Sequence, residues 1–405
     1  MPKRSLWPCG LLLTLFLYGC GVANAAPSLP RLLIQPDDGR GPILQAIAGA
    51  TNNIRLTIYE LTDLQSVSQN PAAPADSIVQ ALVDKARSGV TVRVIMDQNK
   101  YGTGSSSRPD KATAAALEKA GAIVHESSTA FCYTHQKTFV IDGPTAESPR
   151  LAGTALILSL NLMPGYFGGT RDYGVITRDP GIVGEVSRVF DSDFALDNPS
   201  AACKYALSSA TTSPPPSASD TPQVSESALL WSPINSKQKL LTLISSTKQS
   251  LILTTEELVD ADMVCSIQAV AQSPAKPLVR ILLPGDTGSN ASGVKTLLDL
   301  GLPNLSIRVM PGQPSPPNAA TPQTPLYMHG KQVIVDGVQA FVGSENLTNT
   351  SLLQNRELGI LFSDPSMIER LKTVFETDLA PSNSLPAQAC TGGTGCATIA
   401  CPQTH

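Results

Sequence analysis

The chain has 405 residues, of which 42% are hydrophobic and 15% are charged, and its formal net charge is -4. This composition excludes a disordered chain, and the length predicts about two domains, since one domain commonly holds roughly 100–200 residues. The negative balance disfavours a protein that coats nucleic acid, because such proteins show a clear excess of Lys and Arg.

The N-terminus has the pattern of an export signal. Two basic residues precede an apolar run at 11–18, and small residues follow with an Ala-x-Ala site at 23–25. The run is too short for a stable membrane anchor, which needs about 20 residues. We expect residues 1–25 to be removed from a periplasmic or secreted protein. The stretch ending at Cys20 resembles a lipoprotein box, so a lipid anchor there is the alternative. No later segment of the sequence is apolar enough to span a membrane.

Six cysteines follow this predicted leader. They are Cys132, Cys203, Cys265, Cys390, Cys396 and Cys401. In an exported chain they indicate disulfides, whose pairing the sequence leaves open, with plain buried thiols as the alternative for some of them. The spacing of the last three matches no zinc pattern, so we expect structural cysteines and neither a metal site nor a cofactor.

The first half of the chain predicts alternating helices and strands. Helical patterns cover residues 43–51, 75–89 and 110–122, and strands rich in β-branched residues cover 52–63 and 90–97. This alternation is typical of layered βαβ units.

A Pro- and Ser-rich segment at 203–226 is predicted to be a linker, and the same order of elements recurs after it. A helical pattern at 239–247 precedes strands at 249–260 and 278–285. A second Pro-rich run, at 311–325, predicts a long loop.

One eleven-residue phrase occurs in both halves. YTHQKTFVIDG spans 133–143 and YMHGKQVIVDG spans 327–337, and together they hold two of the four histidines of the chain. A repeat period of about 190 residues is too long for a solenoid and indicates a duplicated pair of α/β domains. We place these halves at residues 27–202 and 227–384, followed by a Cys-containing, loop-like tail at 385–405.

Alternation along a strand places the His and the Lys of each phrase on one face. The pairs are His135 with Lys137 and His329 with Lys331. An imidazole beside an ammonium suits an anion better than a core. The aspartate seven positions after each histidine has the opposite parity, so we expect Asp142 and Asp336 to face away and hold local structure.

Each phrase is followed by Ser-x-Asn and then by an Arg-acid pair. The residues are Ser159, Asn161, Arg171 and Asp172 in the first half, and Ser344, Asn346, Arg356 and Glu357 in the second. The Ser and Asn side chains can donate hydrogen bonds to phosphate oxygens. One copy of such a pattern is a weak signal, but two copies with the same following residues indicate function more than surface histidines kept by duplication alone.

With these residues, the chain resembles the phospholipase D superfamily, whose members carry paired HKD motifs. The resemblance covers most of residues 30–380 and rests on HQKTFVID, HGKQVIVD, GSENLTNTSLLQNRE and the looser SLNLMPGYFGGTRD. It implies an α/β fold of two similar α/β/α sandwich halves, related by a pseudo-two-fold axis, with a single active site at their interface. It also implies a two-step phosphodiester displacement without a metal ion, which we expect a monomer to perform.

The resemblance assigns roles to the repeated residues. His135 is expected to attack phosphorus and form a phosphohistidine, while His329 protonates the leaving alcohol and then activates water. Lys137 and Lys331 are expected to hold the nonbridging oxygens. Asp172 and Glu357 are expected to orient the imidazoles. The first half departs from the family pattern by an insert at 144–153 and by an Asp in place of the more usual Glu.

The substrate class is open to alternatives. Two apolar loops follow the Ser-x-Asn elements: one at 162–169 with Tyr166 and Phe167, and its counterpart with Leu352 and Leu353. They either insert apolar side chains into a lipid surface or fold inward as core. We favour a phospholipid at a membrane interface, with hydrolysis and transfer to another alcohol both open. An exported nuclease is the second interpretation, and a binding protein for phosphorylated ligands is the third. The lack of predicted membrane-spanning helices weakens a cardiolipin synthase.

Overall fold

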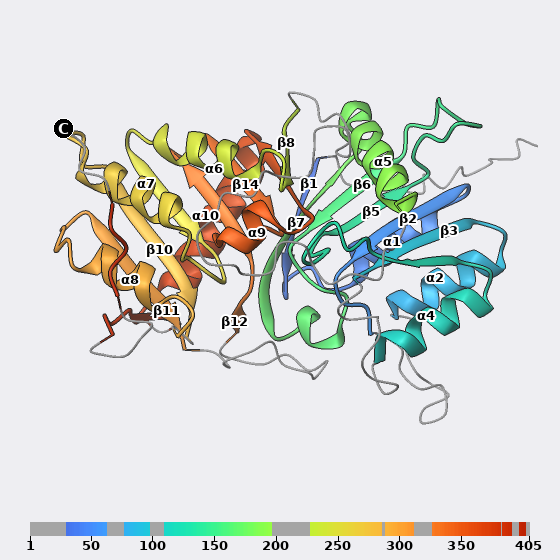
Figure 1. Cartoon of the computed structure of the whole chain (residues 1–405), viewed down its shortest axis with the longest axis horizontal. Helices are drawn as coiled ribbons and strands as arrows, with labels where there is room; N and C mark the ends of the chain where they lie inside the picture. The colour runs from blue at the N-terminus through green and yellow to red at the C-terminus, as the bar shows by residue number, and fades with distance from the viewer. Residues whose placement is uncertain are drawn as a thin grey trace, which may run out of the picture.

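The computed structural model describes residues 30–62, 77–97, 109–196, 227–285, 288–311, 326–381, 383–390 and 397–401. The predicted leader, the linker and most of the second Pro-rich run lie outside these ranges, as do Cys20, Cys203 and Cys396. Within them, helices and strands alternate in two similar halves, which confirms the predicted fold class (Figure 1).

The first half is built on one mixed sheet. Its strands, in spatial order, are β1 (Arg31–Gln35), β7 (Thr170–Thr177), β6 (Thr154–Leu158), β5 (Lys137–Ile141), β2 (Asn53–Ile58), β3 (Thr91–Met96) and β4 (Ile123–Glu126). The helices α1 (Gly41–Gly49), α2 (Ile78–Arg87) and α4 (Pro109–Lys119) cover its outer face and share a core with it. The helix α5 (Pro180–Phe194) packs on the inner face.

The second half repeats this strand order. Its sheet runs β8 (Leu229–Ser232), β15 (Glu357–Phe362), β14 (Gln339–Gly343), β13 (Lys331–Val335), β9 (Ser250–Thr254), β10 (Leu278–Pro284), β11 (Leu305–Met310) and β16 (Leu385–Pro386). The helices α6 (Ser236–Ser245), α7 (Ala261–Gln272) and α8 (Ala291–Leu298) cover the outer face, α9 (Asn349–Leu353) lies near the site, and α10 (Pro365–Leu379) packs on the inner face.

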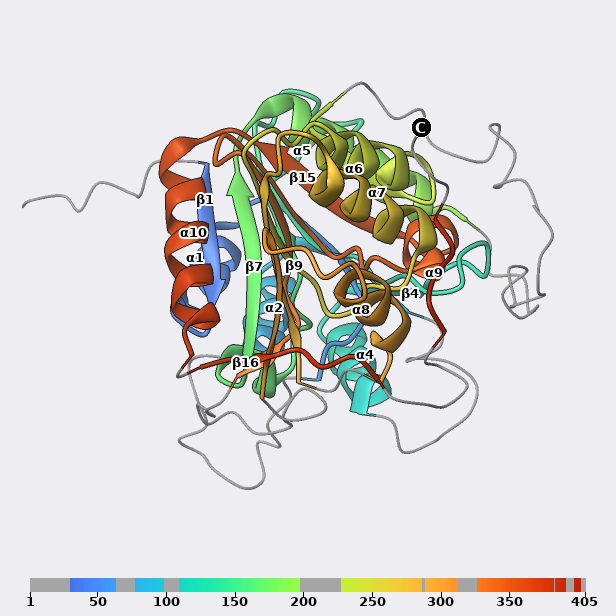
Figure 2. The ribbon, with the colours of Figure 1, turned by 90° about the vertical axis from the view of Figure 1, so that its left-hand side faces the viewer.

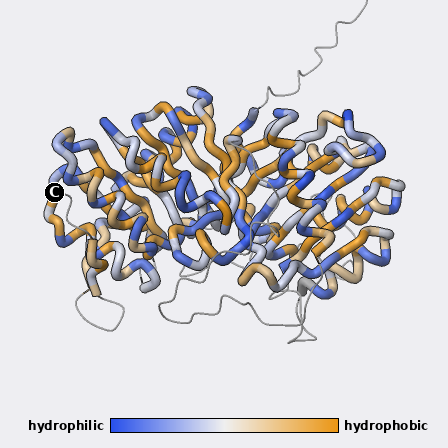
Figure 3. The backbone as a smooth tube through the Cα atoms, turned by 45° about the horizontal axis from the view of Figure 1, so that its top comes forward, coloured by the Kyte–Doolittle hydropathy of each residue, from blue (hydrophilic) through white to orange (hydrophobic). Residues whose placement is uncertain are grey.

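A central core joins the two halves. It contains apolar side chains from both sheets together with α5 and α10, so the sheets lie next to one another with these helices against them (Figure 2). Strand alternation divides the side chains: Val140 and Ile334 enter this shared core, while Phe139 and Val333 enter the outer cores. The apolar segments accordingly run through the interior of both halves (Figure 3).

Each half also sends a short segment into the other. The strand β12 (Tyr327–Met328) of the second half pairs with β7 of the first sheet, and Thr134 of the first half forms a bridge with Arg356 of the second. These segments directly precede His329 and His135. The exchange therefore places each motif histidine against a strand from the opposite half.

The two motif aspartates hold local structure, in agreement with their strand parity. Asp142 accepts hydrogen bonds from three successive backbone N–H groups at 51–53, and Asp336 does the same at 248–250. Both aspartates adopt positive φ values of 50° and 53°, in the left-handed region that Asp tolerates better than most residues. Each carboxylate ties the end of its His-Lys strand to the start of the neighbouring strand.

The tail is more ordered than the sequence predicted. Residues Leu385–Pro386 form β16, which pairs with the edge strand β11, and Cys401 forms a disulfide with Cys265 on α7. Cys132 and Cys390 are disulfide-bonded as well. An edge strand exposes unpaired backbone groups, which gives the tail a physical reason to pair there. Among the described residues, no helix is long and apolar enough to cross a membrane.

Candidate active site

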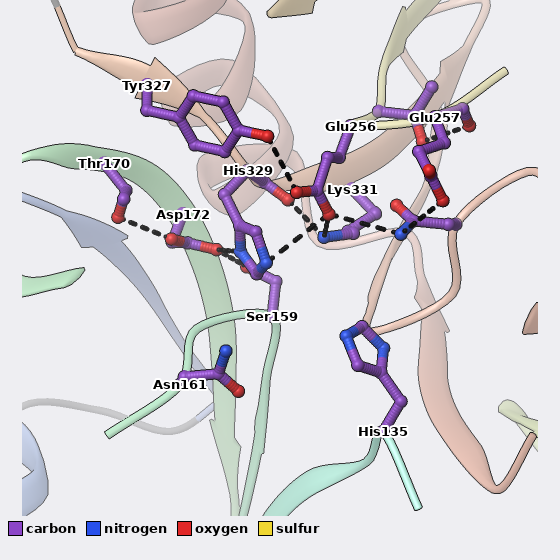
Figure 4. A network of polar contacts seen from close by, with 12 residues as sticks. His135, Ser159, Asn161, Thr170, Asp172, Glu256, Glu257, Tyr327, His329 and Lys331 are labelled. Atoms are coloured by element: carbon purple, nitrogen blue, oxygen red, sulfur yellow. Dashed lines mark hydrogen bonds and ion pairs between the residues drawn. The ribbon is translucent and has the colours of Figure 1, made fainter. Parts of the chain in front are cut away.

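The two motif histidines face one space between the halves, and each is oriented by an acid from the other half. His135 Nδ1 lies 2.9 Å from Glu357 Oε2, and His329 Nδ1 lies 2.8 Å from Asp172 Oδ1. An ionised carboxylate only accepts hydrogen bonds, so Nδ1 of each ring must donate and Nε2 is left for chemistry. Figure 4 shows both rings directed into the same region.

Buried donors fix both acids. Asp172 accepts hydrogen bonds of 2.6 Å from Ser159 Oγ and from Thr170 Oγ1. Glu357 accepts from Ser351 Oγ at 2.8 Å and from Asn355 Nδ2 at 3.1 Å. Burial alone would raise the pKa of each carboxyl, but the paired imidazole, a motif lysine and one serine hydroxyl (Ser159 for Asp172, Ser344 for Glu357) lower it below its ordinary value. Both acids are therefore held as carboxylates.

The electrostatic environment of the two histidines differs. Burial lowers the pKa of His135 to about 4; the Glu357 carboxylate opposes this effect and Lys137 adds to it. His329 has Asp172 at Nδ1 and, in addition, Glu256 Oε2 at 3.5 Å from Nε2. His329 thus has a carboxylate near each ring nitrogen, whereas burial favours His135 as the neutral base.

The motif lysines are buried beside their histidines. Lys137 Nζ donates to the backbone oxygen of His135 at 2.6 Å, and Lys331 Nζ donates to that of His329 at 2.5 Å. Burial lowers the pKa of Lys137 to about 7, with Glu357 opposing and Lys331 adding to the effect. Because Lys331 acts on both Lys137 and His135, the two motifs converge on one charged site.

The structure gives the predicted serines partners inside the protein. Ser159, fully buried, donates to Asp172 and accepts from the backbone N–H of Tyr173 at 2.9 Å. Ser344, also fully buried, accepts from the backbone N–H of Leu358 at 3.1 Å. Both hydroxyls lie behind the acids. In this arrangement they support the acids and do not line the space for phosphate.

The predicted asparagines are buried beside the glutamates that follow β2 and β9. Asn161 Nδ2 donates to Glu60 Oε2 at 3.0 Å, and Asn346 Nδ2 donates to Glu256 Oε2 at 3.2 Å. The side-chain oxygens of both asparagines are buried without a hydrogen-bond partner. The asparagines therefore keep unused capacity at the edge of the site.

Three carboxylates at the site were not predicted. Glu60 follows β2, and Glu256 and Glu257 follow β9, at the ends of the strands that flank each His-Lys strand. The segments 52–63 and 249–260 contain the signal, because β2 and β9 pair antiparallel with the His-Lys strands β5 and β13, so the end of each lies beside the start of its neighbour.

The apolar loop of the first half folds inward, which is one of the two outcomes that its sequence left open. Residues Pro164–Phe167 form a 3₁₀ helix in which Tyr166 and Phe167 are only 5% and 8% exposed and join the outer core. The Tyr166 hydroxyl reaches Asn161, and its ring packs edge-on against His329. Leu352 is buried, whereas Leu353 is 37% exposed. The aromatic rings serve to pack the site.

Among the described residues, no group of three or more His, Cys, Asp or Glu side chains is arranged to hold a metal ion. The groups that could hold an anion are the two lysines and the two imidazoles. A tetrahedral anion between them would meet the His135 ring on one side and the His329 ring on the other.

The sequence model described as cardiolipin synthase, PLD-like domain, matches residues 43–194 and 240–379. Both matched ranges contain one HKD motif, and the chain belongs to the phospholipase D superfamily. Phospholipase D Z of Dictyostelium discoideum is 32% identical over 115 residues, which cover 23% of this chain and 27% of that protein. The chain thus matches about a quarter of the length of this curated relative.

Two solved structures share the fold across both halves. Phosphatidylserine synthase from Haemophilus influenzae Rd KW20 superimposes with a TM-score of 0.58 at 14% identity, covering 88% of this chain and 87% of that one. Polyphosphate kinase from Porphyromonas gingivalis gives 0.60 at 16% identity, covering 90% of this chain and 50% of that one. At these identities the likeness concerns the fold.

Proposed function

We propose that this protein is a phosphodiesterase of the phospholipase D type that acts on phospholipids. The observation that carries the proposal is the reciprocal pairing of His135 with Glu357 and of His329 with Asp172. This pairing directs both Nε2 atoms to one space, one on a neutral ring and one on a ring that also has Glu256 nearby. An in-line displacement needs a nucleophile and a proton donor in this arrangement.

In the first step, His135 Nε2 attacks phosphorus. The P–N bond forms as the bond to the head-group oxygen breaks, and that oxygen takes the proton from His329 Nε2. In the second step, His329, now neutral, removes a proton from water, whose oxygen attacks phosphorus. The P–N bond breaks, its electron pair returns to His135, and phosphatidic acid is released. An alcohol in place of water gives head-group exchange.

The lysines supply the charge that the transition state needs. Lys137 and Lys331 balance the negative charge that develops on the nonbridging oxygens, and Asn161 and Asn346 offer hydrogen bonds at the edge of the site. Buried positive groups act strongly there, because little water screens them. Asp172 and Glu357 hold the tautomers that keep Nε2 reactive in both steps.

The charge of the site favours lipid over nucleic acid. Glu60, Glu256 and Glu257 lie beside the motif residues, and the chain has a net charge of -4, so a polyanion would meet negative charge around the single phosphate that the lysines hold. Tyr133 and Leu353 are 40% and 37% exposed, and their segments are joined by backbone hydrogen bonds at 132 and 356. These two side chains remain as apolar contacts for a lipid surface.

The disulfide between Cys265 and Cys401 supports export to an oxidising compartment. We infer a periplasmic or secreted enzyme that works as a monomer, because both motifs of the site belong to one chain. The predicted leader at 1–25 agrees with this location.

The test uses the chain without its leader, in EDTA, on phosphatidylcholine vesicles and on single-stranded DNA in parallel. We expect choline release that His135→Ala and His329→Ala each abolish. His125→Ala is the matched control, since that ring stacks on Phe194 outside the site. DNA cleavage without lipid turnover would instead establish a nuclease. Saturable binding without turnover of either substrate would establish a binding protein.

A further inference from the structure

The Glu256 carboxylate lies where the second motif would bind a phosphate oxygen. Its Oε2 atom is 3.1 Å from Lys331 Nζ, 3.2 Å from Asn346 Nδ2 and 3.5 Å from His329 Nε2. The Oε1 atom accepts a hydrogen bond of 2.8 Å from the Tyr327 hydroxyl (Figure 4). One carboxylate oxygen thus contacts the histidine, the lysine and the asparagine of one half.

The first half has no such carboxylate at the matching position. The alignment of 52–63 with 249–260 places Tyr59 opposite Glu256. The Tyr59 ring packs edge-on against His135, with centroids 4.7 Å apart, and Lys137 Nζ lies 5.2 Å from its centroid. A neutral ring in one half and a carboxylate in the other occupy equivalent places. The site is therefore asymmetric in charge by one unit.

The surroundings of Glu256 favour its ionised form. Burial would raise the pKa of its carboxyl, but Lys331 and His329 and the hydrogen bonds from Lys331 and Tyr327 hold it well below its usual range. Its side chain is 19% exposed, so water screens the charge only in part. Any further negative charge that enters beside Lys331 meets this carboxylate at short range.

We propose that Glu256 is a specificity-determining residue that admits the single negative charge of a phosphodiester and rejects the second charge of a phosphomonoester. This inference rests on the proposed function. A diester carries one charge at neutral pH, whereas a phosphate monoester carries about 1.5 to 2. Phosphatidic acid, the product of hydrolysis, gains its second charge in the site, so Glu256 also favours its release.

The test replaces Glu256 by Gln, which keeps the shape and removes the charge. Inorganic phosphate is the probe, and its dissociation constant is measured by calorimetry at pH 7.5 and at pH 5, where it carries close to one charge. We expect Glu256→Gln to bind phosphate at least about tenfold more tightly at pH 7.5, and the gain to shrink at pH 5. Glu256→Ala serves as a second variant, and melting temperatures confirm that each variant folds.

Glu369→Gln is the control, because it changes the net charge equally and its exposed side chain on α10 pairs with Lys372. Unchanged or weaker phosphate binding in both Glu256 variants would overturn the inference. So would an equal gain in the control, since net charge alone would then explain it. The binding measurement needs no turnover, so an inactive enzyme with the predicted phosphate shift would overturn the proposed function and leave the charge selection standing.

Discussion

The two halves share one strand order and one motif, yet their charged groups differ in ways that separate two chemical roles. His135 has one carboxylate partner and a tyrosine ring beside it, while His329 has carboxylates at both ring nitrogens. The difference comes from Tyr59 and Glu256, which occupy the same position of the repeat. A duplicated fold thus supplies two unlike imidazoles, and a displacement at phosphorus needs two unlike imidazoles.

The largest expected effect on the reaction rate comes from replacing the two histidines, and it should distinguish their roles. With a soluble phosphodiester that releases p-nitrophenol, His135→Ala should lose about 10⁴-fold or more in rate and form no covalent intermediate, because it lacks the nucleophile. His329→Ala should still release p-nitrophenol in one burst, because this leaving group needs little protonation, and should then stall as a phosphoenzyme. Intact-protein mass spectrometry of quenched samples detects the added mass. Accumulation in His135→Ala alone would reverse the two roles.

Two buried ion pairs join the halves and differ in their surroundings. Arg356 pairs with Asp193 and lies over the rings of Phe131 and Trp231, whereas Arg171 pairs with Asp378. Replacing either arginine by Ala leaves a buried carboxylate unpaired, which should lower the free energy of unfolding by about 3–5 kcal/mol. Arg356→Ala should cost more, because it also loses the ring contacts. Urea unfolding of both variants measures the difference.

A matched control for this comparison is Arg370→Ala. Arg370 also crosses between the halves, to Asp38, but its side chain is 38% exposed. An exposed pair contributes at most about 1 kcal/mol, so this variant should stay close to the parent protein. Equal losses in all three variants would show that burial does not distinguish these ion pairs.

Sequence reasoning identified the motif residues but not their partners. The repeated phrase and its following Arg-acid pair indicated His135, His329, Asp172 and Glu357, because each half supplies a second copy of the pattern. Strand parity predicted that Asp142 and Asp336 face away from the site, because residues an odd number of positions apart point to opposite faces of a strand. Neither signal says whether an acid serves the histidine of its own half. That exchange depends on β12 and on the Thr134 bridge, which are short contacts between distant segments.

The role of Glu256 and the inward packing of the apolar loop at 162–169 could not be predicted from the sequence, for a different reason. Comparison of the halves emphasises what they share, and Glu256 is a place where they differ. The loop around Tyr166 is apolar whether it inserts into lipid or packs inward, so composition alone left both outcomes open. Its burial follows from the Asn161 and His329 contacts, which only the folded chain brings together.

The pH dependence should show the same asymmetry. With the pKa of His135 at about 4 and that of Lys137 at about 7, kcat/KM of the free enzyme should rise through about pH 4 and fall through about pH 7. Lys137→Arg, which cannot lose its charge in this range, should move the alkaline limb upward at reduced activity. An unmoved alkaline limb would assign it to another group.

The free energy of unfolding should depend on pH through the titration of His135. The folded pKa of about 4 lies below the unfolded value of about 6.5, so the folded state disfavours the charged ring. The contribution to stability is full above about pH 6.5 and is lost as the pH falls through about 4. His135→Ala should lack this loss in urea unfolding between the two values. A loss of the same size in the variant would locate the titration elsewhere.

The smallest expected effect is that of Ser159→Ala, which tests whether the Ser159 hydroxyl supports Asp172 or contacts the substrate. Ser159 donates to Asp172 behind the site, so Ser159→Ala should lower kcat by about tenfold, the cost of one hydrogen bond to a charged group, while KM stays the same. A phosphate-binding hydroxyl would instead raise KM. Asn161→Ala provides the contrast, because the proposed function has this amide contact the phosphate, so its loss should raise KM. If both variants change KM alone, Ser159 contacts the substrate after all, and the acid of the first half is held by Thr170.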